Sequence, residues 1–409
     1  MTPVNIIILS DLHVGKGARA GDMCPYENNN AVDGDYIKTF INFLNDKQIH
    51  AKYLIISGDI CHEAQPDEFK LASSLIINIA KRLNIPKGNI FIVPGNHDVD
   101  WSIIKNYPDD KSGVRTKQMY DPIKNKECIF NKIFRQGKPF MLEQPFFTIW
   151  EDTDILVVGY NSSWHDGPKE QVHHGLFAND SSKEIEKFLC NIDFSQGKIK
   201  IFLVHHHPLQ YSDPLPNLPD FSTMTNSENL LTLLRKYQFD MLIHGHKHSP
   251  RFSTVTTNSG FPLVVLCSGS FSCLLDTRWS GYVNNQFHIV EIRGRDNEDK
   301  CIYGTVDSFT YLSGHGWIPS KVHNGIVHRN YFGKYLNPEK LKEFLAPIIQ
   351  EGLKLKDYIK WNNIVTNHSN LKYLQQDLLE NILHELSPKL GFDLHGEFPD
   401  NLIILKKSA

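Results

Sequence analysis

The sequence predicts an α/β protein in which helices pack on a mostly parallel sheet. Two observations support this class. Short apolar runs typical of buried strands alternate along the chain with segments whose apolar residues recur at spacings of three and four, as in amphipathic helices. Directly after several of these runs come aspartate, asparagine and histidine residues, and functional loops in open α/β sheets lie at the carboxyl ends of strands.

The expected elements follow one another in that alternation. Strands are expected at Val4–Leu9, Tyr53–Ile56, Ile90–Val93, Ile155–Gly159, Ile201–Val204, Met241–Ile243, Leu263–Cys267 and Gln286–Ile292. Helices are expected at Tyr36–Lys47, Asp67–Leu83, Ser181–Leu189 and Asn226–Tyr237. The strand-rich stretch from Ser253 to Ile292 predicts a second sheet stacked on the first.

One segment departs from this alternation in the first half of the chain. Residues 102–139 are irregular and basic, with nine lysines or arginines against four acidic residues. They begin four residues after Asp98, so we expect them to overhang a site there. A solvated lysine-rich surface is the first interpretation of their charge, and a cap over an anionic substrate is the alternative.

The C-terminal part turns helical. Asn337-Pro338 is typical of an N-cap followed by proline at the first helical position. The apolar residues between Leu371 and Leu386 form an amphipathic stripe, which predicts a helix docked on its own domain or, alternatively, a surface for a partner. We therefore expect a catalytic domain at 1–300, a connecting strand and loop segment at 301–335, and a helical C-terminal extension at 336–409.

Composition excludes several classes of protein. The formal net charge of −3 argues against a protein that coats nucleic acid without specificity. Seven cysteines, an odd number without CxxC spacing, argue against a disulfide framework and against a zinc ribbon. We find no signal-like N-terminus and no apolar stretch near the ~18 residues that a membrane span needs. We therefore expect a soluble, cytoplasmic protein with reduced thiols and no membrane partner.

Five polar blocks follow five of the expected strands. They read Asp11-Leu12-His13, Gly58-Asp59, Gly95-Asn96-His97-Asp98, His205-His206-His207-Pro208 and Gly245-His246-Lys247-His248. Because such blocks lie at the carboxyl ends of strands, we expect them to converge on one edge of a sheet although they span more than 200 residues.

The residue types in these blocks are those that hold transition metals. Aspartate is a hard oxygen ligand, and imidazole binds zinc, iron, manganese or nickel. A carboxylate has two oxygens, so Asp59 is the candidate to bridge two ions. One ion is expected to take Asp11, His13, Asp59 and His248, and the other Asp59, Asn96, His205 and His246. Two dications ~3.5–4 Å apart keep a surplus positive charge, attract a phosphate and supply a bridging hydroxide as nucleophile. We expect manganese, with iron, zinc or nickel as alternatives.

Other residues near these blocks are candidates for contact with substrate. His97 is expected to donate a proton to the leaving oxygen or to steady the phosphoryl charge, and Asp98 to orient it. Lys16, Arg19, His62 and His206 are candidates for substrate binding. For each of these four, a structural or merely exposed residue is the alternative.

The blocks, in this order, resemble the calcineurin-like metallophosphoesterase superfamily over roughly residues 4–292. The resemblance implies an αββα sandwich of two stacked mixed sheets flanked by helices, and hydrolysis of phosphomonoesters or phosphodiesters. Gly58-Asp59-Ile60-Cys61-His62 departs from the patterns of the purple acid phosphatases and the Ser/Thr protein phosphatases, and His13 stands where the purple enzymes have glycine. With these two branches set aside, the sequence is similar to the cyclic-nucleotide phosphodiesterases, repair nucleases and lipid-precursor pyrophosphatases of this superfamily.

The leading functional hypothesis is a dinuclear metal phosphodiesterase that acts on a nucleotide or a nucleic acid. The alternatives are a phosphomonoesterase, possibly acting on a phosphoprotein, and a metal-bearing interaction scaffold. The expected partners are a phosphorylated small molecule or nucleic acid as substrate, and possibly a protein partner or a second copy at the C-terminal helices.

Overall fold

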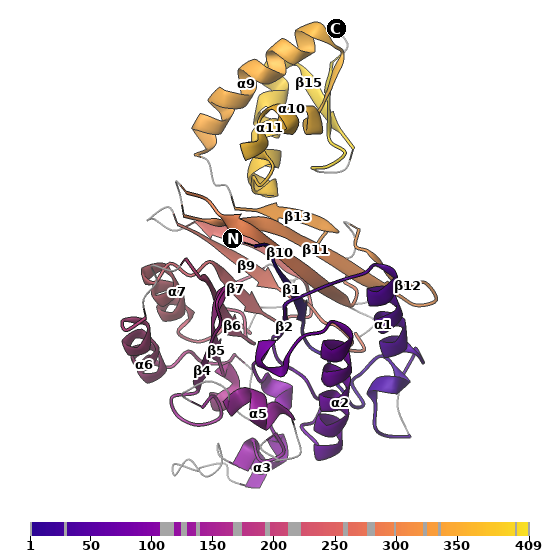
Figure 1. The fold of residues 1–409 in the computed structure, drawn as a ribbon, viewed down its shortest axis with the longest axis vertical. Helices are drawn as coiled ribbons and strands as arrows, with labels where there is room; N and C mark the ends of the chain where they lie inside the picture. The colour runs from indigo at the N-terminus through magenta and orange to yellow at the C-terminus, as the bar shows by residue number, and fades with distance from the viewer. Residues whose placement is uncertain are drawn as a thin grey trace. The chain divides into compact units, whose positions relative to one another are not determined.

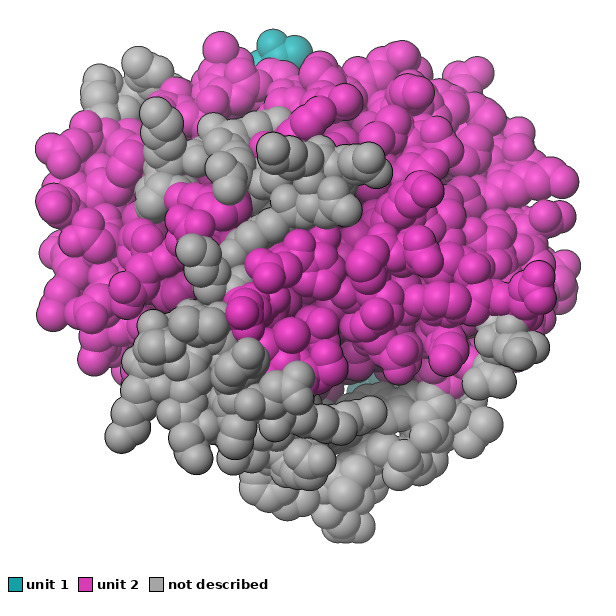
Figure 2. Space-filling model, turned by 90° about the horizontal axis from the view of Figure 1, so that it is seen from below, with its two compact units in different colours: residues 1–3, 292–306, 329–409 teal, residues 4–291, 307–328 magenta. Residues whose placement is uncertain are grey.

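The computed structural model describes residues 2–27, 31–106, 118–123, 129–135, 140–166, 174–192, 197–211, 222–256, 261–275, 283–297, 300–321, 325–333, 337–396 and 399–407. The chain divides into two compact units. Unit 1 comprises residues 1–3, 292–306 and 329–409, and unit 2 comprises residues 4–291 and 307–328. Figure 2 shows one face of unit 2 in magenta.

Two mixed sheets form the main part of the fold. The first has the strand order β12-β11-β10-β1-β2-β3, and β13 also pairs with β11. Its strands are β1 Val4–Leu9, β2 Tyr53–Ile56, β3 Ile90–Ile92, β10 Gln286–Arg295, β11 Ile302–Leu312, β12 Gly316–Pro319 and β13 Arg329–Phe332. The pairs β1·β2 and β2·β3 are parallel, so their carboxyl ends lie at the same edge.

The second sheet has the strand order β4-β5-β6-β7-β9-β8. Its strands are β4 Phe147–Glu151, β5 Ile155–Tyr160, β6 Ile199–Val204, β7 Met241–His244, β8 Arg251–Thr256 and β9 Pro262–Cys267. The inner pairs from β5 to β9 are parallel, whereas β4 and β8 are antiparallel to their neighbours. The described residues of the inner strands are buried throughout, which explains why these strands read as continuous apolar runs.

Helices cover the outer faces of these sheets, so the predicted αββα arrangement is confirmed. Figure 1 shows α1 (Tyr36–Asp46) and α2 (Pro66–Arg82) beside the first sheet, and α6 (Asn179–Leu189) and α7 (Ser227–Lys236) beside the second. One detail of the prediction is wrong. The stretch from Ser253 to Ile292 does not form a sheet of its own, because β8 and β9 belong to the second sheet and β10 pairs with β1 in the first.

The basic segment 102–139 is described only in part. The structure describes α3 (Trp101–Asn106), residues 118–123 and α5 (Ile129–Arg135), and the rest of the expected overhang lies outside the described residues. Ile129 N donates to Ser73 Oγ of α2 at 3.2 Å, and the Phe130 ring lies 5.7 Å from that of Phe69. The α5 part of the segment is therefore packed against the domain.

The C-terminal part of unit 1 has its own apolar core. It comprises α9 Pro338–Leu355, α10 Trp361–Asn367 and α11 Gln376–Leu390, with the strand order β14-β16-β15 at Tyr358–Lys360, Ile403–Lys406 and Phe392–His395. The Asn337 side chain accepts hydrogen bonds from Glu339 N and Lys340 N, as its N-cap pattern predicts. Most of the leucine stripe is buried in this core, although the helical pattern did not predict the small sheet beside it. A partner at this unit stays a prediction.

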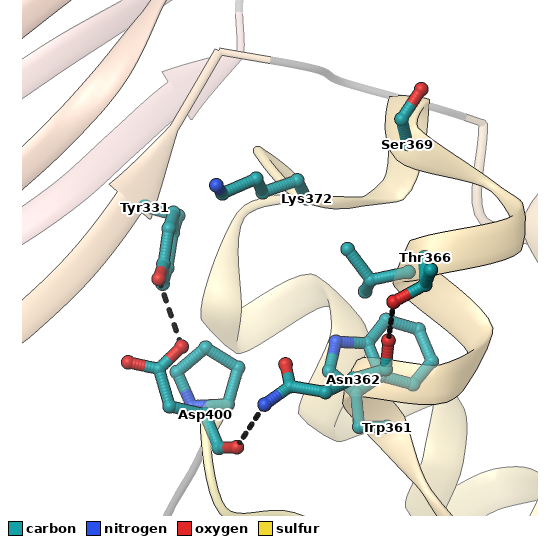
Figure 3. Close-up of a pocket in the computed structure, with 9 residues that line it drawn as sticks. Tyr331, Trp361, Asn362, Thr366, Ser369, Lys372 and Asp400 are labelled. Carbon is teal, nitrogen blue, oxygen red and sulfur yellow. Dashed lines mark hydrogen bonds between the residues drawn. The ribbon is translucent and has the colours of Figure 1, made fainter.

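Unit 1 also contains an open pocket of about 370 Å³ (Figure 3). The Tyr331 hydroxyl donates to the Asp400 carboxylate at 2.8 Å, and Asn362 Nδ2 donates to the Asp400 carbonyl at 2.7 Å. These bonds tie β13 and α10 to the segment before β16. The polar groups they use stabilise the unit, and we assign the pocket no ligand.

Among the described residues, no helix combines the length and the apolar character that crossing a bilayer requires.

Candidate metal centre

The five polar blocks meet in unit 2 where strands of both sheets end. The first three follow β1, β2 and β3, and the other two follow β6 and β7. The expectation of convergence on one edge of a single sheet is therefore corrected, because the two stacked sheets each supply part of the site. Among the described residues, four groups of ligand atoms could hold a metal ion, and two of them involve Cys273 or the His62 and His97 pair beside His13. The other two share Asp59, and we call them the first lobe and the second lobe.

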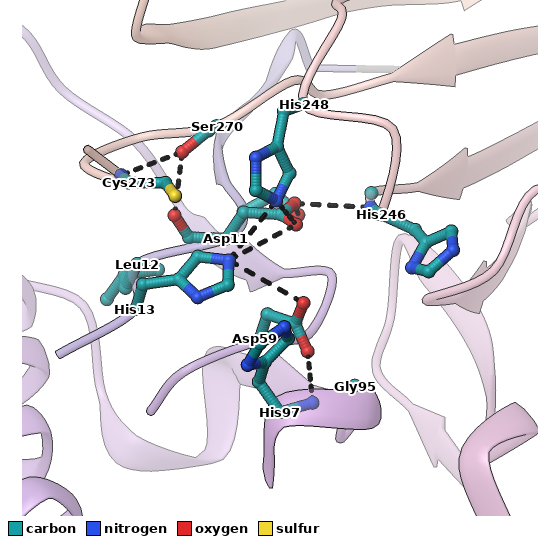
Figure 4. A network of polar contacts seen from close by, with 12 residues as sticks. Asp11, Leu12, His13, Asp59, Gly95, His97, His246, His248, Ser270 and Cys273 are labelled. Carbon is teal, nitrogen blue, oxygen red and sulfur yellow. Dashed lines mark hydrogen bonds and ion pairs between the residues drawn. The ribbon is translucent and has the colours of Figure 1, made fainter. Parts of the chain in front are cut away.

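The first lobe consists of Asp11, His13, Asp59 and His248 (Figure 4). Their ligand atoms all lie within 4.8 Å of one another. His248 Nε2 is 3.1 Å from Asp11 Oδ1 and 3.2 Å from His13 Nε2. His13 Nε2 is in turn 3.6 Å from Asp59 Oδ2. Nitrogen and oxygen lone pairs thus converge on one small volume.

The second lobe consists of Asp59, Asn96, His205 and His246. His205 Nε2 lies 3.2 Å from Asp59 Oδ2 and 3.1 Å from Asn96 Oδ1. His246 Nδ1 lies 3.0 Å from the same Asn96 oxygen. His205 Nδ1 is 2.8 Å from the carbonyl of Ser57, which turns Nε2 toward the lobe. Asp59 belongs to both lobes, so all seven expected ligand residues are brought together around it.

The donor set fits a pair of cations. Asp11 is fully buried, and its Oδ1 faces Nε2 of His248 at 3.1 Å and Nε2 of His13 at 4.0 Å. A buried carboxylate requires a compensating positive charge, which a cation between these groups would supply. Burial, together with the neighbouring His97, lowers the pKa of His13 well below its usual range, and burial together with His206 lowers that of His246. These imidazoles are therefore neutral near pH 7, which is the form that binds metal.

Asp59 and His205 carry opposite charges in the protein without metal. Burial opposes ionisation of Asp59, but the adjacent His205 holds its pKa well below the usual range. Burial disfavours the charged form of His205, yet the Asp59 carboxylate raises the pKa of this histidine to about 9. A proton on His205 thus supplies the positive charge that Asp59 requires and that a bound dication would replace.

The backbone at the site is strained. Five of the seven expected ligand residues adopt the left-handed conformation, with φ of 49° at Asp11, 48° at His13, 50° at Asp59, 74° at His246 and 54° at His248. Such conformations cost free energy in residues other than glycine and concentrate at functional sites. This backbone conformation directs the five side chains toward the two lobes at the ends of the strands.

Gly95 shows why a glycine precedes Asn96. A Cβ at this position would collide with the carboxylate and the backbone nitrogen of Asp59. We expect Gly95→Ala to displace Asp59, to weaken metal binding at least about tenfold and to destabilise the fold by about 1–3 kcal/mol. Metal titration calorimetry and thermal unfolding measure both effects. Gly88→Ala is the matched control, because nothing lies within 4 Å of a Cβ there; equal behaviour of the two variants would contradict the argument.

His97 lies at the border of the first lobe. Its ring centroid is 4.7 Å from that of His13, and its ring stacks on His62 at 5.5 Å with an interplanar angle of 16°. His97 Nδ1 lies 2.8 Å from the His62 carbonyl oxygen, and the backbone nitrogen of His97 donates to Asp59 Oδ1 at 2.8 Å. His62 is thus close to the site, and its carbonyl holds the ring of His97.

Asp98 does not orient His97, so this expectation is corrected. One oxygen of Asp98 accepts hydrogen bonds from the backbone nitrogens of Ile60 and Cys61, and the other accepts from Gly95 N. Burial, reinforced by the charge of Asp59, raises the pKa of Asp98 to about 7. Through these three hydrogen bonds, the side chain of Asp98 connects the loop that carries Asp59 to the loop that carries Asn96.

Lys16 and Arg19, two of the expected substrate-binding residues, have their own surroundings. Lys16 is exposed, with its Nζ 5.6 Å from the centre of the Tyr26 ring. The guanidinium of Arg19 donates to Asp33, Asn285 and Ser313, at 2.8, 2.5 and 3.0 Å, so it holds loops together.

His206 is fully buried beside the second lobe, with its ring centroid 4.4 Å from that of His246 and 5.1 Å from that of His205. Its Nδ1 lies 2.8 Å from Ser162 Oγ and its Nε2 3.3 Å from Asp166 Oδ2. Asp33, Asn285 and Ser313 engage the guanidinium of Arg19, and Ser162 engages Nδ1 of His206. Contact of Lys16, Arg19 or His206 with substrate stays a prediction.

Sequence reasoning missed Cys273. Its sulfur lies within 4.8 Å of the ligand nitrogens of His13 and His248 (Figure 4). The available signal was weak: Cys273 follows the expected strand Leu263–Cys267 at a short distance, in a serine-rich loop without a recognisable motif.

Comparisons with known proteins agree with this geometry. A family model described as calcineurin-like phosphoesterase matches residues 4–250. The uncharacterized metallophosphoesterase-like protein YydB of Bacillus subtilis (strain 168) is 22% identical over 249 residues, which are 58% of this chain and 49% of that protein. The chain thus spans about half the length of this curated relative.

Solved structures show similarity at low sequence identity. Purple acid phosphatase PPD1 from yellow lupin (Lupinus luteus) matches 77% of this chain and 52% of its own, at 16% identity and a TM-score of 0.42. Vacuolar Protein Sorting 29 from Cryptosporidium parvum matches 82% of this chain and all of its own (100%), at 12% identity and a TM-score of 0.34.

Proposed function

Because this chain belongs to the calcineurin-like phosphoesterase family, we propose that it is a dinuclear metal-dependent phosphodiesterase that hydrolyses a nucleotide or nucleic-acid phosphodiester. The observation that carries the proposal is the position of Asp59, whose carboxylate belongs to both lobes. Two divalent transition-metal ions fit the lobes, with manganese as our first choice and iron, zinc or nickel as alternatives. When bound, such ions supply positive charge toward the phosphoryl oxygens and acidify water as a nucleophile.

The chain's own residues would bind the substrate and hold the leaving group. The lobes carry only two carboxylates, Asp11 and Asp59, against the charge of two dications, so an anionic phosphoryl group is attracted. His97 is half-buried at the border of the first lobe, and the His62 carbonyl at Nδ1 leaves Nε2 for the substrate. From there Nε2 would donate a proton to the leaving oxygen or a hydrogen bond to the phosphoryl group.

We also propose that the chain lies outside the purple and Ser/Thr phosphatase branches. Ile60, Cys61 and His62 follow the shared Asp59, where those branches carry other residues, and His13 contributes to the first lobe. Cyclic-nucleotide phosphodiesterases and repair nucleases then remain as the similar groups, which supports a diester substrate.

A comparison of two synthetic substrates tests the proposal. Manganese-loaded protein is expected to cleave bis-p-nitrophenyl phosphate with a kcat/KM at least about tenfold above that for p-nitrophenyl phosphate, a difference of ~1.4 kcal/mol in transition-state binding. Chelator-treated protein is expected to be inactive until metal is restored. Cyclic nucleotides, dinucleotides and single- and double-stranded DNA and RNA then narrow the substrate class.

Two results would overturn the proposed phosphodiesterase activity. A higher kcat/KM for the monoester would indicate a phosphomonoesterase. No cleavage of either substrate by the manganese, iron, zinc and nickel forms would indicate a metal-bearing scaffold.

A further inference from the structure

Cys273 stands beside the first lobe from outside the five polar blocks. Its sulfur, His13 and His248 form a cluster of three ligand atoms, all within 4.8 Å of one another. His13 and His248 also belong to the cluster with Asp11 and Asp59. The thiol of Cys273 is half-buried.

The loop that carries Cys273 is held firmly against the first block. Ser270 Oγ accepts from Cys273 N and donates to the Asp11 carbonyl, both at 2.9 Å (Figure 4). Ser272 Oγ donates to the carbonyl of Leu12 at 2.6 Å. Asn285 Nδ2 donates to the Cys273 carbonyl at 3.0 Å. The backbone on both sides of the thiol is thus fixed to the residues that carry Asp11 and His13.

The other donors of the first lobe are close together as well. Asp11 Oδ1 is fully buried and lies 3.1 Å from His248 Nε2. His13 Nε2 and His248 Nε2 point at each other across 3.2 Å. Two ring nitrogens and a carboxylate oxygen that meet in this way can all be satisfied at once by a positive ion between them.

We propose that Cys273 is a further ligand of the first lobe, bound to the ion through its thiolate sulfur, an inference that rests on the proposed dinuclear centre. On coordination the S–H bond breaks, the sulfur lone pair forms the bond to the ion and the proton passes to water. The ion then has sulfur beside the nitrogens of His13 and His248 and the oxygens of Asp11 and Asp59.

A sulfur ligand changes which ion the first lobe prefers. Thiolate is a soft donor that favours zinc or iron, whereas manganese prefers oxygen donors. The second lobe has only nitrogen and oxygen donors among the residues that form it. The two lobes therefore differ in metal preference, with the thiophilic ion in the first.

Cobalt(II) reports the ligand directly, because a cobalt–thiolate bond gives a charge-transfer absorption in the near ultraviolet. Full-length, chelator-treated protein is titrated with cobalt chloride without oxygen, and the wild-type chain is expected to develop this band together with the weaker d–d bands. Cys273→Ser is expected to lose the charge-transfer band and keep the d–d bands. Cys190→Ser is the matched control, because Cys190 is exposed and outside the site, and it is expected to behave as wild type.

Competition between zinc and manganese provides a second readout. The occupancy ratio of zinc to manganese, measured by elemental analysis after equilibration with both ions, is expected to fall about tenfold or more in Cys273→Ser. If the serine variant is unstable, the cobalt titration and the zinc–manganese competition are repeated with Cys273→Ala, whose folding is checked by circular dichroism.

The outcomes separate this inference from the proposed function. Cobalt binding with d–d bands but identical near-ultraviolet absorption in wild type and Cys273→Ser would overturn the thiolate ligand and leave the dinuclear centre intact. Absence of all cobalt bands in the wild-type chain would overturn both. A thiolate band in protein that cleaves neither synthetic ester would support the ligand and reject the phosphodiesterase.

Discussion

Asp59→Asn is expected to lower kcat/KM for bis-p-nitrophenyl phosphate by about 10³-fold or more. The substitution keeps the shape of the side chain but removes the negative charge of a carboxylate whose Oδ2 faces both His13 and His205. Without this charge the two lobes would hold two dications less tightly, so the metal content measured by elemental analysis should fall to one ion or none per chain. Steady-state kinetics at saturating metal gives the loss in rate.

The Asp59 variant also has a matched control. Asp180→Asn makes the same chemical change at a carboxylate that is 84% exposed on α6, and it should retain wild-type rate and metal content. An Asp59→Asn protein that keeps both ions and more than a tenth of the activity would show that this carboxylate does not bridge.

His97→Ala has the second largest expected effect, a fall in kcat of about 10²–10³-fold with unchanged metal content. The imidazole lies beside the first lobe but is not needed to complete either lobe, so the ions should stay bound. His50→Ala, which removes an exposed histidine after α1, is expected to leave both quantities unchanged.

The leaving group distinguishes the two roles open to His97. p-Nitrophenolate departs without a proton, whereas the alkoxide of a dinucleotide requires one. If His97 donates a proton, the defect on a dinucleotide should exceed the defect on bis-p-nitrophenyl phosphate by at least about tenfold. Equal defects on both substrates would rule out proton donation and leave stabilisation of the phosphoryl charge.

Local sequence was sufficient for the strands that carry the site. Val4–Leu9 and Tyr53–Ile56 occur where the sequence predicts them, because almost all of their residues are apolar, Asn5 excepted, as in a strand buried on both faces. Metal-binding residue types directly after such strands predicted which side chains would meet. The sequence therefore predicts the types of the ligand atoms, although it does not give the distances between them.

Roles that depend on partners distant in the chain were not predictable. Arg19 and His206 are the right types to contact a phosphate, but Asn285 and Ser162 engage them in the folded protein. Asp98 is adjacent to His97 in sequence, yet its oxygens face backbone nitrogens of the loop after β2. Sequence adjacency says nothing about which way such a side chain turns.

The sequence by itself determined the alternation of strands and helices and the seven candidate ligand residues, because apolar periodicity and residue type are properties of short segments. Only the tertiary structure decided that both sheets supply those ligands, that Ser162 engages His206 and that Cys273 lies beside the first lobe. The physical reason is that these features arise from distances between segments far apart in the chain, as between His13 and His248, and such distances are set by packing of the whole domain.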